Sequence, residues 1–237
     1  MIIGITGTIG AGKGAVVNIL KKKGFRHYSV REFLINEIKK RGLPINRDSM
    51  VSVANQIREV NGPSFIVEKL YEKAIQDKYS IIESIRTIGE AEKIKELGGI
   101  LLAVDANPEK RYSRVLTRQS ETDNISFEKF LEDEKREMFS ANPYEQNLSG
   151  CKNLADYVLN NDKTLDFLEK KVDEILEKII SKTQREVSEK KEPEKTEEKS
   201  YTETEKTQLN EKQKKARKEQ IIFHGMSILW VLQFYLL

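Results

Sequence analysis

The sequence contains a single cysteine, Cys151, so the chain can form neither an internal disulfide nor a cysteine-based zinc site. Such sparse use of cysteine fits a reducing compartment. Proline and glycine are also scarce, with 5 and 13 residues in 237, which excludes collagen-like proteins. Hydrophobic residues make up only 38% of the chain, a low share for a wholly globular protein. We therefore expect part of the chain to lie outside a folded core.

An excess of charge of one sign is also missing, because 41 basic residues stand against 38 acidic ones and the net charge is +3. Domains that bind nucleic acid are usually clearly basic, so the sequence predicts no nucleic-acid partner. The first residues enter a strand pattern at once, without the charged and apolar regions of a signal peptide. We therefore expect a cytoplasmic protein.

Composition divides the chain into three zones. Residues 1–180 combine apolar runs with helical patterns and are expected to fold. Residues 181–220 are almost entirely Lys, Glu, Thr, Gln and Ser, and they cannot bury enough apolar surface to offset the entropy of ordering. We predict a charged, disordered linker there in preference to a frayed, solvated helix. Residues 221–237 turn abruptly apolar and form a separate tail.

Strand and helix patterns alternate within the first zone. The predicted strands cover residues 2–6, 25–30, 79–83, 100–104 and 157–159. The predicted helices cover residues 14–23, 31–41, 48–60, 63–77, 88–97, 108–117, 127–139 and 165–180. This alternation predicts an α/β fold, with a parallel sheet covered by helices on both faces and followed by a disordered tail.

The most specific motif is Gly7-Thr-Ile-Gly-Ala-Gly-Lys13, which matches the phosphate-binding loop (P-loop) pattern G-x-x-x-x-G-K. It follows a predicted strand and opens a predicted helix, the context that this motif requires. Glycines let backbone N–H groups line an anion-sized concavity, and the helix N-terminus favours negative charge. The lysine can reach the outer phosphates of a nucleoside triphosphate. The predicted donor-binding residues are Gly7, Gly10, Ala11, Gly12, Lys13, Gly14 and Ala15.

The loop resembles that of the nucleoside-monophosphate kinases, which often reads G-x-x-G-x-G-K-G-T. Gly10-Ala-Gly-Lys-Gly14 fits this variant, but Ala15 stands where the threonine would be. The resemblance implies a P-loop NTPase fold, ATP as phosphoryl donor and Mg²⁺ as cofactor. The missing hydroxyl would normally contact Mg²⁺, so Ala15 puts both the metal contact and full catalytic strength in question.

A kinase with a phosphorylated acceptor needs several arginines from separate segments, because guanidinium groups bind phosphate bidentately. The candidates are Arg31, Arg47, Arg58 and Arg86. Arg86 lies just beyond a predicted strand, where open α/β sheets place their ligands. The stretch Glu83-Ser-Ile-Arg86 resembles the adenylate-kinase-like acid followed by arginine. The resemblance implies that Glu83 holds the magnesium through water and that Arg86 binds the acceptor phosphate.

Over about residues 1–180 the chain is also similar to dephospho-CoA-kinase-like proteins of archaea and other microbes. That similarity is carried by Ser29-Val-Arg31, by Gly42-Leu-Pro-Ile-Asn-Arg47 and by the segment around Arg58-Glu-Val-Asn-Gly62-Pro63. The resemblance does not choose the acceptor. A nucleoside or deoxynucleoside monophosphate and dephospho-CoA remain alternatives, and the predicted substrate-binding residues are Arg31, Arg58 and Arg86.

A mobile lid is implied by the same resemblance for the region that begins after Val104. Its predicted helix carries Arg111, Arg114 and Arg118, and we favour Arg118 as the arginine that closes over the transferring phosphoryl group. Together with Lys13 and Arg86, Arg118 completes the predicted catalytic set. Asn160-Asn161-Asp162 could contact the donor base, but an ordinary turn and helix cap is favoured there. His27 lies among aromatic and apolar residues and is interpreted as a packing residue.

Two interpretations of the tail, residues 221–237, remain open. It could be a short membrane anchor, with the preceding basic cluster facing the cytoplasm. Alternatively, back-translation in a shifted frame resembles the start of a deoxycytidylate deaminase domain, so the tail could be a frameshifted remnant, which we favour slightly. The zinc-binding H-x-E and C-x-x-C elements of such a domain are absent.

Taken together, these residues predict an ATP-dependent phosphotransferase that acts on a small nucleotide or nucleotide-like acceptor. The alternative from another class is a non-catalytic P-loop module that binds nucleotide, possible also in a membrane-tethered form. Ala15 is the residue that favours this alternative.

Overall fold

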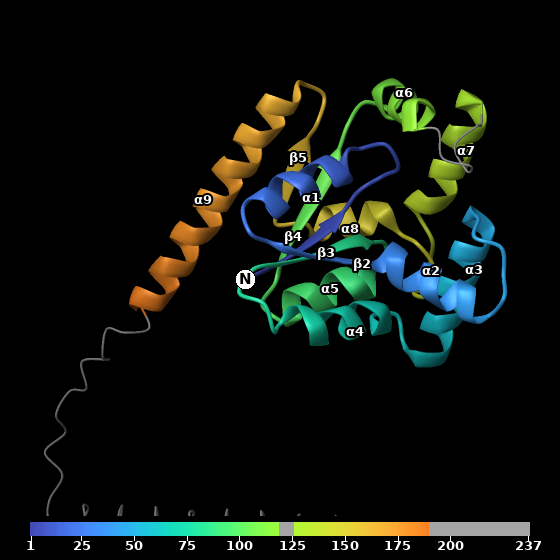
Figure 1. Ribbon diagram of the computed structural model, residues 1–237, viewed down its shortest axis with the longest axis horizontal. Coiled ribbons are helices and arrows are strands. Elements are labelled where there is room, and N and C mark those ends of the chain that lie inside the picture. Colours follow the sequence, from blue (N-terminus) through green and yellow to red (C-terminus); the bar gives the residue numbers. More distant parts are fainter. Residues whose placement is uncertain (119–125, 190–237) are drawn as a thin grey trace, which may run out of the picture. The chain divides into compact units, whose positions relative to one another are not determined.

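A computed structural model gives the fold of residues 1–118 and 126–189 (Figure 1). Its centre is one five-stranded parallel sheet in the order β2-β3-β1-β4-β5. The strands are β1 (Ile2–Thr6), β2 (Arg26–Ser29), β3 (Ser80–Ile85), β4 (Ile100–Asp105) and β5 (Tyr157–Asn160). The predicted parallel α/β fold is confirmed. Because β1 lies between β3 and β4, the loop that follows β1 emerges at the centre of the sheet edge.

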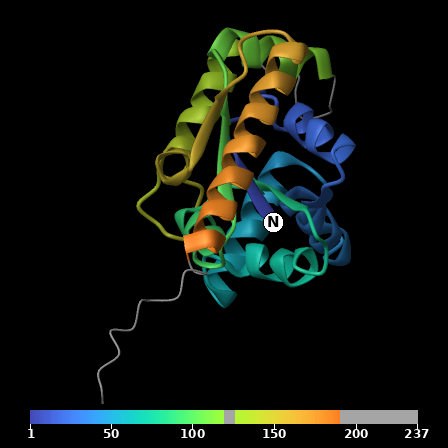
Figure 2. The same cartoon turned by 90° about the vertical axis from the view of Figure 1, so that its left-hand side faces the viewer.

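Helices cover both faces of the sheet, as Figures 1 and 2 show. They are α1 (Lys13–Lys22), α2 (Val30–Lys40), α3 (Arg47–Asn61), α4 (Phe65–Ala74), α5 (Ile88–Glu96), α6 (Pro108–Arg118), α7 (Phe127–Met138), α8 (Leu148–Leu154) and α9 (Leu165–Glu189). Helices α1 and α9 pack on one face, and α2 to α5 pack with α8 on the other. Helices α6 and α7 lie beyond the carboxyl ends of the strands.

The two-residue period of the strands separates two hydrophobic cores. In β1, Ile3 and Ile5 face the core beneath α1 and α9, whereas Ile2 faces the core beneath α2, α4 and α5. Because both faces are covered, all five residues of β1 are buried. The free thiol of Cys151 lies in the second core, and burial raises its pKa to about 12. Burial thus favours the protonated thiol, which is the less nucleophilic form.

Two elements differ from the sequence-based expectation. Helix α8 was not predicted, because its seven residues, LSGCKNL, are too short to show a helical period. It is started by Asn147, whose side chain accepts a hydrogen bond from the backbone N–H of Gly150. Helix α9 was expected to end at residue 180 but runs to Glu189, so the first residues of the predicted disordered linker are helical. Good helix formers such as Lys182, Gln184 and Arg185 account for this extension.

The compact unit that contains the sheet spans Met1–Lys182. In the described part of the chain, no helix has the length and apolar character needed to cross a membrane. The tail at 221–237 and most of the predicted linker lie outside the described residues, so both interpretations of the tail remain predictions.

Candidate functional site

The loop between β1 and α1 adopts the backbone conformation that an anion-binding loop needs. Gly10 and Gly12 have φ values of +75° and +99°, in the left-handed region that favours glycine. Space also requires glycine here, because a Cβ at Gly10 would collide with the backbone of Arg111 and one at Gly12 with the side chain of Asn161. Because Gly12, the N-cap of α1, has no side chain, no side-chain cap competes with an anion for the N–H groups at the start of the helix.

Lys13 folds back over this loop. Its Nζ donates hydrogen bonds to the carbonyl oxygens of Gly7 and Thr8, at 2.8 and 2.9 Å. The ammonium group is therefore held beside the loop, where the outer phosphates of a bound nucleotide would lie. Of the remaining predicted donor-binding residues, Gly14 is exposed, and the methyl group of Ala15 packs against the core beneath α1.

Two side chains from distant segments support the loop from outside. The amide Nδ2 of Asn161, which follows β5, donates to the carbonyl oxygen of Ala11 at 2.9 Å. Arg114 of α6 donates to the carbonyl oxygen of Asn161 at 2.7 Å. Asn161 is thus buried against the loop. The backbone N–H of Asp162 donates to Asn160 Oδ1 at 3.0 Å, in line with the turn favoured from the sequence, and a contact with the donor base stays a prediction.

The three arginines of α6 have different surroundings. Arg111 is buried, and it donates to the carbonyl oxygen of Ala106 and to the carboxylate of Glu134 on α7, both at 2.7 Å. It therefore ties α6 to α7. Arg114 contacts the loop, and Arg118 is the last residue of α6, with its side chain outside the described residues. The catalytic role of Arg118 stays a prediction.

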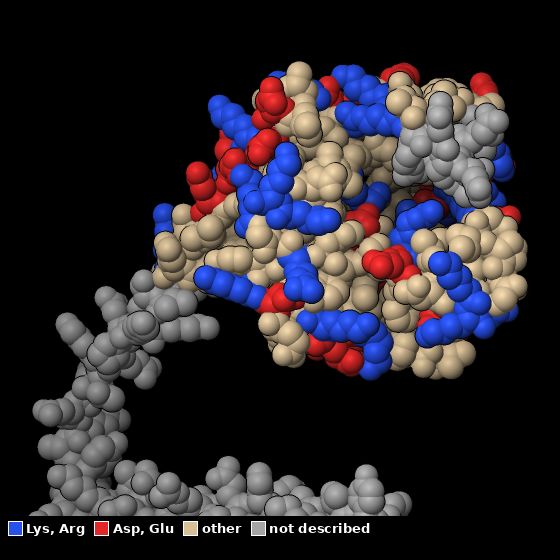
Figure 3. Space-filling model, in the orientation of Figure 1, with Lys and Arg blue, Asp and Glu red and all other residues tan. Residues whose placement is uncertain are grey.

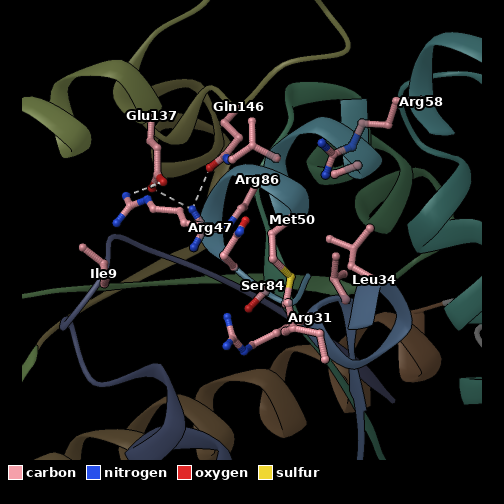
Figure 4. A pocket seen from close by; sticks show the side chains of 15 residues that line it. Ile9, Arg31, Leu34, Arg47, Met50, Arg58, Ser84, Arg86, Glu137 and Gln146 are labelled. Carbon is pink, nitrogen blue, oxygen red and sulfur yellow. Dashed lines mark hydrogen bonds and ion pairs between the residues drawn. The ribbon is translucent and has the colours of Figure 1, made fainter. Parts of the chain in front are cut away.

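A cavity opens next to the loop, between α2, α3 and the end of β3 (Figure 4). Ile9 of the loop forms part of its wall, and its polar lining includes Arg31, Arg47, Ser84 and Arg86. Apolar side chains of α2, α3 and the segment between them also line the cavity: Val30, Leu34, Ile45, Met50, Val51 and Ala54. Such a combination of apolar side chains with several cationic groups suits an anionic ligand that also has an apolar part.

Arg86 reaches this cavity because β3 is irregular at its end. The pairing of β1 with β3 shifts between Ile5 and Thr6, and Ser84 has φ of +75°. A non-glycine residue in the left-handed region is strained, and such strain concentrates at functional sites. The bulge is held by the Thr6 hydroxyl, which donates to the carbonyl oxygen of Ile85 at 2.8 Å. As a result, both Ser84 and Arg86 line the cavity.

Glu137 of α7 joins two of the arginines. Arg47 Nη2 donates to Glu137 Oε1 at 2.6 Å, and Arg86 Nη1 donates to Glu137 Oε2 at 2.8 Å, as Figure 4 shows. Arg86 Nη1 also donates to Gln146 Oε1 at 2.7 Å. Burial opposes ionisation of Glu137, but Arg86 and Arg47 hold the pKa of this carboxyl below its ordinary value.

Arg58 has a different surrounding from the one expected of a substrate-binding residue. It is buried, and its Nε and Nη2 both donate to Glu90 Oε1, at 3.0 and 2.8 Å. The other oxygen of Glu90 accepts the backbone N–H of Arg86 at 2.9 Å. This buried pair therefore fixes the backbone from which Arg86 extends. Arg58 also lines the cavity, and its contact with an acceptor stays a prediction.

Glu83, the predicted magnesium residue, lies at the carboxyl end of β3 with its side chain mostly buried. It accepts a hydrogen bond from the Ser84 hydroxyl at 2.7 Å. His27 Nε2 lies 3.9 Å from Glu83 Oε2, and burial lowers the pKa of this histidine, which supports its interpretation as a packing residue. Within residues 1–118 and 126–189, no group of three acidic, histidine or cysteine side chains is placed to hold a metal ion by itself.

The sequence did not identify Ser84, Glu137 and Gln146 as site residues. Glu137 and Gln146 lie more than 50 residues from Arg86 in sequence, and only the fold brings them to it. Glu137 is one of several acidic residues of α7, and nothing in their spacing distinguishes it. On the face seen in Figure 3, basic and acidic side chains are interspersed, in line with the near-zero net charge.

Comparison with known proteins finds a matching family and a similar sequence. Residues 3–140 match the family described as the AAA domain. A UPF0200 protein of Methanococcus vannielii is 31% identical over 174 residues, which cover 71% of this chain and 91% of that protein.

Two solved structures share the fold. TT1252 from Thermus thermophilus is similar with a TM-score of 0.53 and 21% identity, covering 75% of this chain and 97% of that one. Shikimate kinase from Acinetobacter baumannii in complex with shikimate is similar with a TM-score of 0.50 and 16% identity, covering 76% and 93%. At these identities the likeness shows a kinase-like P-loop fold and does not extend to substrate.

Proposed function

This chain belongs to the AAA domain family and to the UPF0200 proteins, and we propose that it is an ATP-dependent phosphotransferase whose acceptor is a nucleotide or nucleotide-like phosphorylated molecule. One observation carries the proposal: Ile9 of the phosphate loop lines the same cavity as Arg31 and Arg86. A donor held by the loop and an anionic acceptor held by the arginines would therefore be neighbours.

In this proposal, catalysis consists mainly of positioning and charge stabilisation. The loop N–H groups and Lys13 bind the donor phosphates, and Arg31 and Arg86 orient the acceptor. An acceptor oxygen forms a bond to the γ-phosphorus while the bond to the β–γ bridging oxygen breaks, so that ADP leaves. Arg118 is assigned to the lid that covers the transferring group and excludes water.

Magnesium is assigned to Glu83, acting through a water molecule. A Mg²⁺ ion beside nucleotide phosphates commonly needs only one or two protein carboxylates, and the mostly buried carboxylate at the end of β3 fits that requirement. When bound, the ion would offset the charge of the phosphates. Because Ala15 supplies no hydroxyl, Glu83 is the principal protein group available to this ion in our proposal.

The test is a coupled assay of ADP release by the full chain with ATP, Mg²⁺ and a panel of acceptors. The panel contains ribonucleoside and deoxyribonucleoside monophosphates and dephospho-CoA. The proposal expects at least one acceptor to raise ADP release well above the rate with ATP alone. If no acceptor raises the rate while ATP still binds, the phosphotransferase is excluded and the binding module is supported.

A non-catalytic nucleotide-binding module is the second candidate, favoured by Ala15. The methyl group of Ala15 packs against the core beneath α1. It offers no oxygen that could bind a metal ion, so the chemical role of the missing hydroxyl is not replaced at this position. This candidate expects tight ATP binding without acceptor-stimulated turnover.

A further inference from the structure

We infer that the carboxylate of Glu137 is an internal substitute for the acceptor's phosphate, and that a phosphate monoester binds between Arg47 and Arg86 by exchanging with it. The inference rests on the proposed function in one respect, since it locates the acceptor within the same cavity. It adds Arg47 to the acceptor-binding residues and gives Glu137 the role of a competing anion.

The first support is geometric. Glu137 bridges two guanidinium groups from different elements, with donor–acceptor distances of 2.6 and 2.8 Å, and all three side chains line the cavity. Two guanidinium groups that share one anion form the arrangement that binds a phosphate oxyanion. The carboxylate therefore occupies a place whose chemistry suits a phosphate group.

The second support is the placement of the pair on its helices. Glu137 lies in the last turn of α7, where the helix dipole disfavours an anion, and Arg47 is the first residue of α3, where the dipole disfavours a cation. Neither position favours its charge by itself. An external anion between Arg47 and Arg86 would instead lie near the N-terminus of α3, which favours negative charge.

The third support is the charge of the cavity. Arg58 is paired with Glu90, which leaves Arg31, Arg47 and Arg86 as the other cations that line the cavity. Glu137 pairs with two of them, Arg47 and Arg86, and Asp133 lies 3.9 Å from Arg47. Among the described residues, Arg31 forms no hydrogen bond or ion pair, so its guanidinium group is available to a ligand. Once Glu137 is displaced, these three cations against the carboxylate of Asp133 leave a charge of +2, which a phosphate monoester dianion would neutralise.

Replacing the Glu137 carboxylate by phosphate would also break ion pairs between elements that line the cavity. The Arg47–Glu137 ion pair connects α3 with α7, and Arg86 connects Glu137 with the end of β3. When phosphate takes the place of the carboxylate, α7 loses its ion pair to α3 through Glu137 and keeps the longer contact, 3.9 Å, between Asp133 and Arg47. Acceptor binding therefore weakens the link between α7 and α3.

The test measures the affinity for inorganic phosphate by calorimetry, using the full chain with Lys13→Ala so that the phosphate loop contributes little. In this background Glu137→Gln removes the competing charge and retains one acceptor oxygen, so that only one of the two arginines keeps its hydrogen bond to this side chain. We expect this variant to bind phosphate roughly tenfold more tightly. The phosphate then displaces a neutral amide from the arginines, whereas in the unchanged chain it must break stronger hydrogen bonds to an ionised carboxylate. Glu132→Gln, an exposed change of the same charge on the same helix, is the matched control and should leave the affinity unchanged.

Two further variants keep the outcome decisive. Glu137→Asp shortens the side chain so that it reaches one arginine less well, and it should give an intermediate gain even if Glu137→Gln folds poorly. Adding Arg47→Gln to Glu137→Gln should abolish the gain. Equal or weaker phosphate binding by both Glu137 variants overturns the inference, as does a gain that survives the loss of Arg47. None of these measurements requires turnover, so failure here is distinguishable from failure of the proposed function.

Discussion

The phosphate loop and the arginine cavity lie side by side but are built in different ways. The loop consists of seven consecutive residues, and its conformation follows mainly from local glycine geometry, with support from the side chains of Asn161 and Arg114. The cavity draws its lining from residues between Ile9 and Gln146, held in place by a buried ion pair and a strained serine. The loop depends mostly on its own residues, whereas the cavity depends on α2, α3, β3 and α7 and on the segments that connect them. The donor side should therefore respond to single substitutions independently of the acceptor side.

The largest effect should come from breaking the donor side alone. Lys13→Ala removes the ammonium group that neutralises the phosphates, and we expect acceptor-stimulated ADP release to fall roughly a thousandfold. Acceptor affinity, measured by calorimetry without ATP, should stay within about twofold, because Lys13 donates hydrogen bonds to the carbonyl oxygens of Gly7 and Thr8, which belong to the donor side. Loss of acceptor binding in this variant would show that the two regions are not independent.

The second effect concerns the scaffold of the cavity. Glu90→Gln leaves Arg58 as a buried charge with no carboxylate partner, and we expect the free energy of unfolding to fall by roughly 3 kcal/mol. Urea denaturation measures this change. The exposed pair Lys69–Glu72 supplies the control, since Glu72→Gln should cost less than about 1 kcal/mol. Equal costs for the two substitutions would contradict the structural role of the buried pair.

A smaller effect should separate acceptor binding from donor binding. Arg31→Ala removes a cation that has no other partner among the described residues, so we expect the KM for the acceptor to rise roughly tenfold. The fold should be unaffected, since Arg31 is exposed. The KM for ATP should change little, and an equal rise in both constants would place Arg31 on the donor side instead.

The smallest effect should sharpen the account of the loop. Ala15→Thr adds the hydroxyl that related loops place beside Mg²⁺, and one added contact should raise the affinity for Mg²⁺–ATP about fivefold. Titration of Mg²⁺ at fixed ATP measures the gain. Unchanged Mg²⁺ dependence, with thermal stability retained, would show that position 15 lies away from the ion.

Much of the fold followed from the sequence. The strand at Ile2–Thr6, the alternation of elements and the loop ending at Lys13 were all predicted, because each depends on periodicity or on residues close together in the chain. Helix α8 was missed, and the extent of α9 was underestimated by nine residues, from 180 to Glu189. Short helices and charged helix ends carry little periodic signal.

The candidate site was predictable only in part. Arg31 and Arg86, which the sequence predicts to bind the acceptor, both line the cavity, and their contact with an acceptor stays a prediction. The partners of these arginines were not predictable. Glu137 reaches Arg86 across 51 positions of sequence, and Glu90 neutralises Arg58 across 32. Such long-range carboxylate partners decide which arginines remain available to a ligand, and only tertiary structure shows them.

The most direct test of the central claim is the affinity of a bisubstrate molecule, two nucleosides joined by five phosphates, which can occupy the loop and the cavity together. Calorimetry with the full chain should show that it binds much more tightly than ATP, because one molecule makes both sets of contacts. Lys13→Ala and Arg86→Ala should each weaken this binding. A bisubstrate affinity no higher than that of ATP, and insensitive to Arg86, would contradict the claim that loop and cavity form one site.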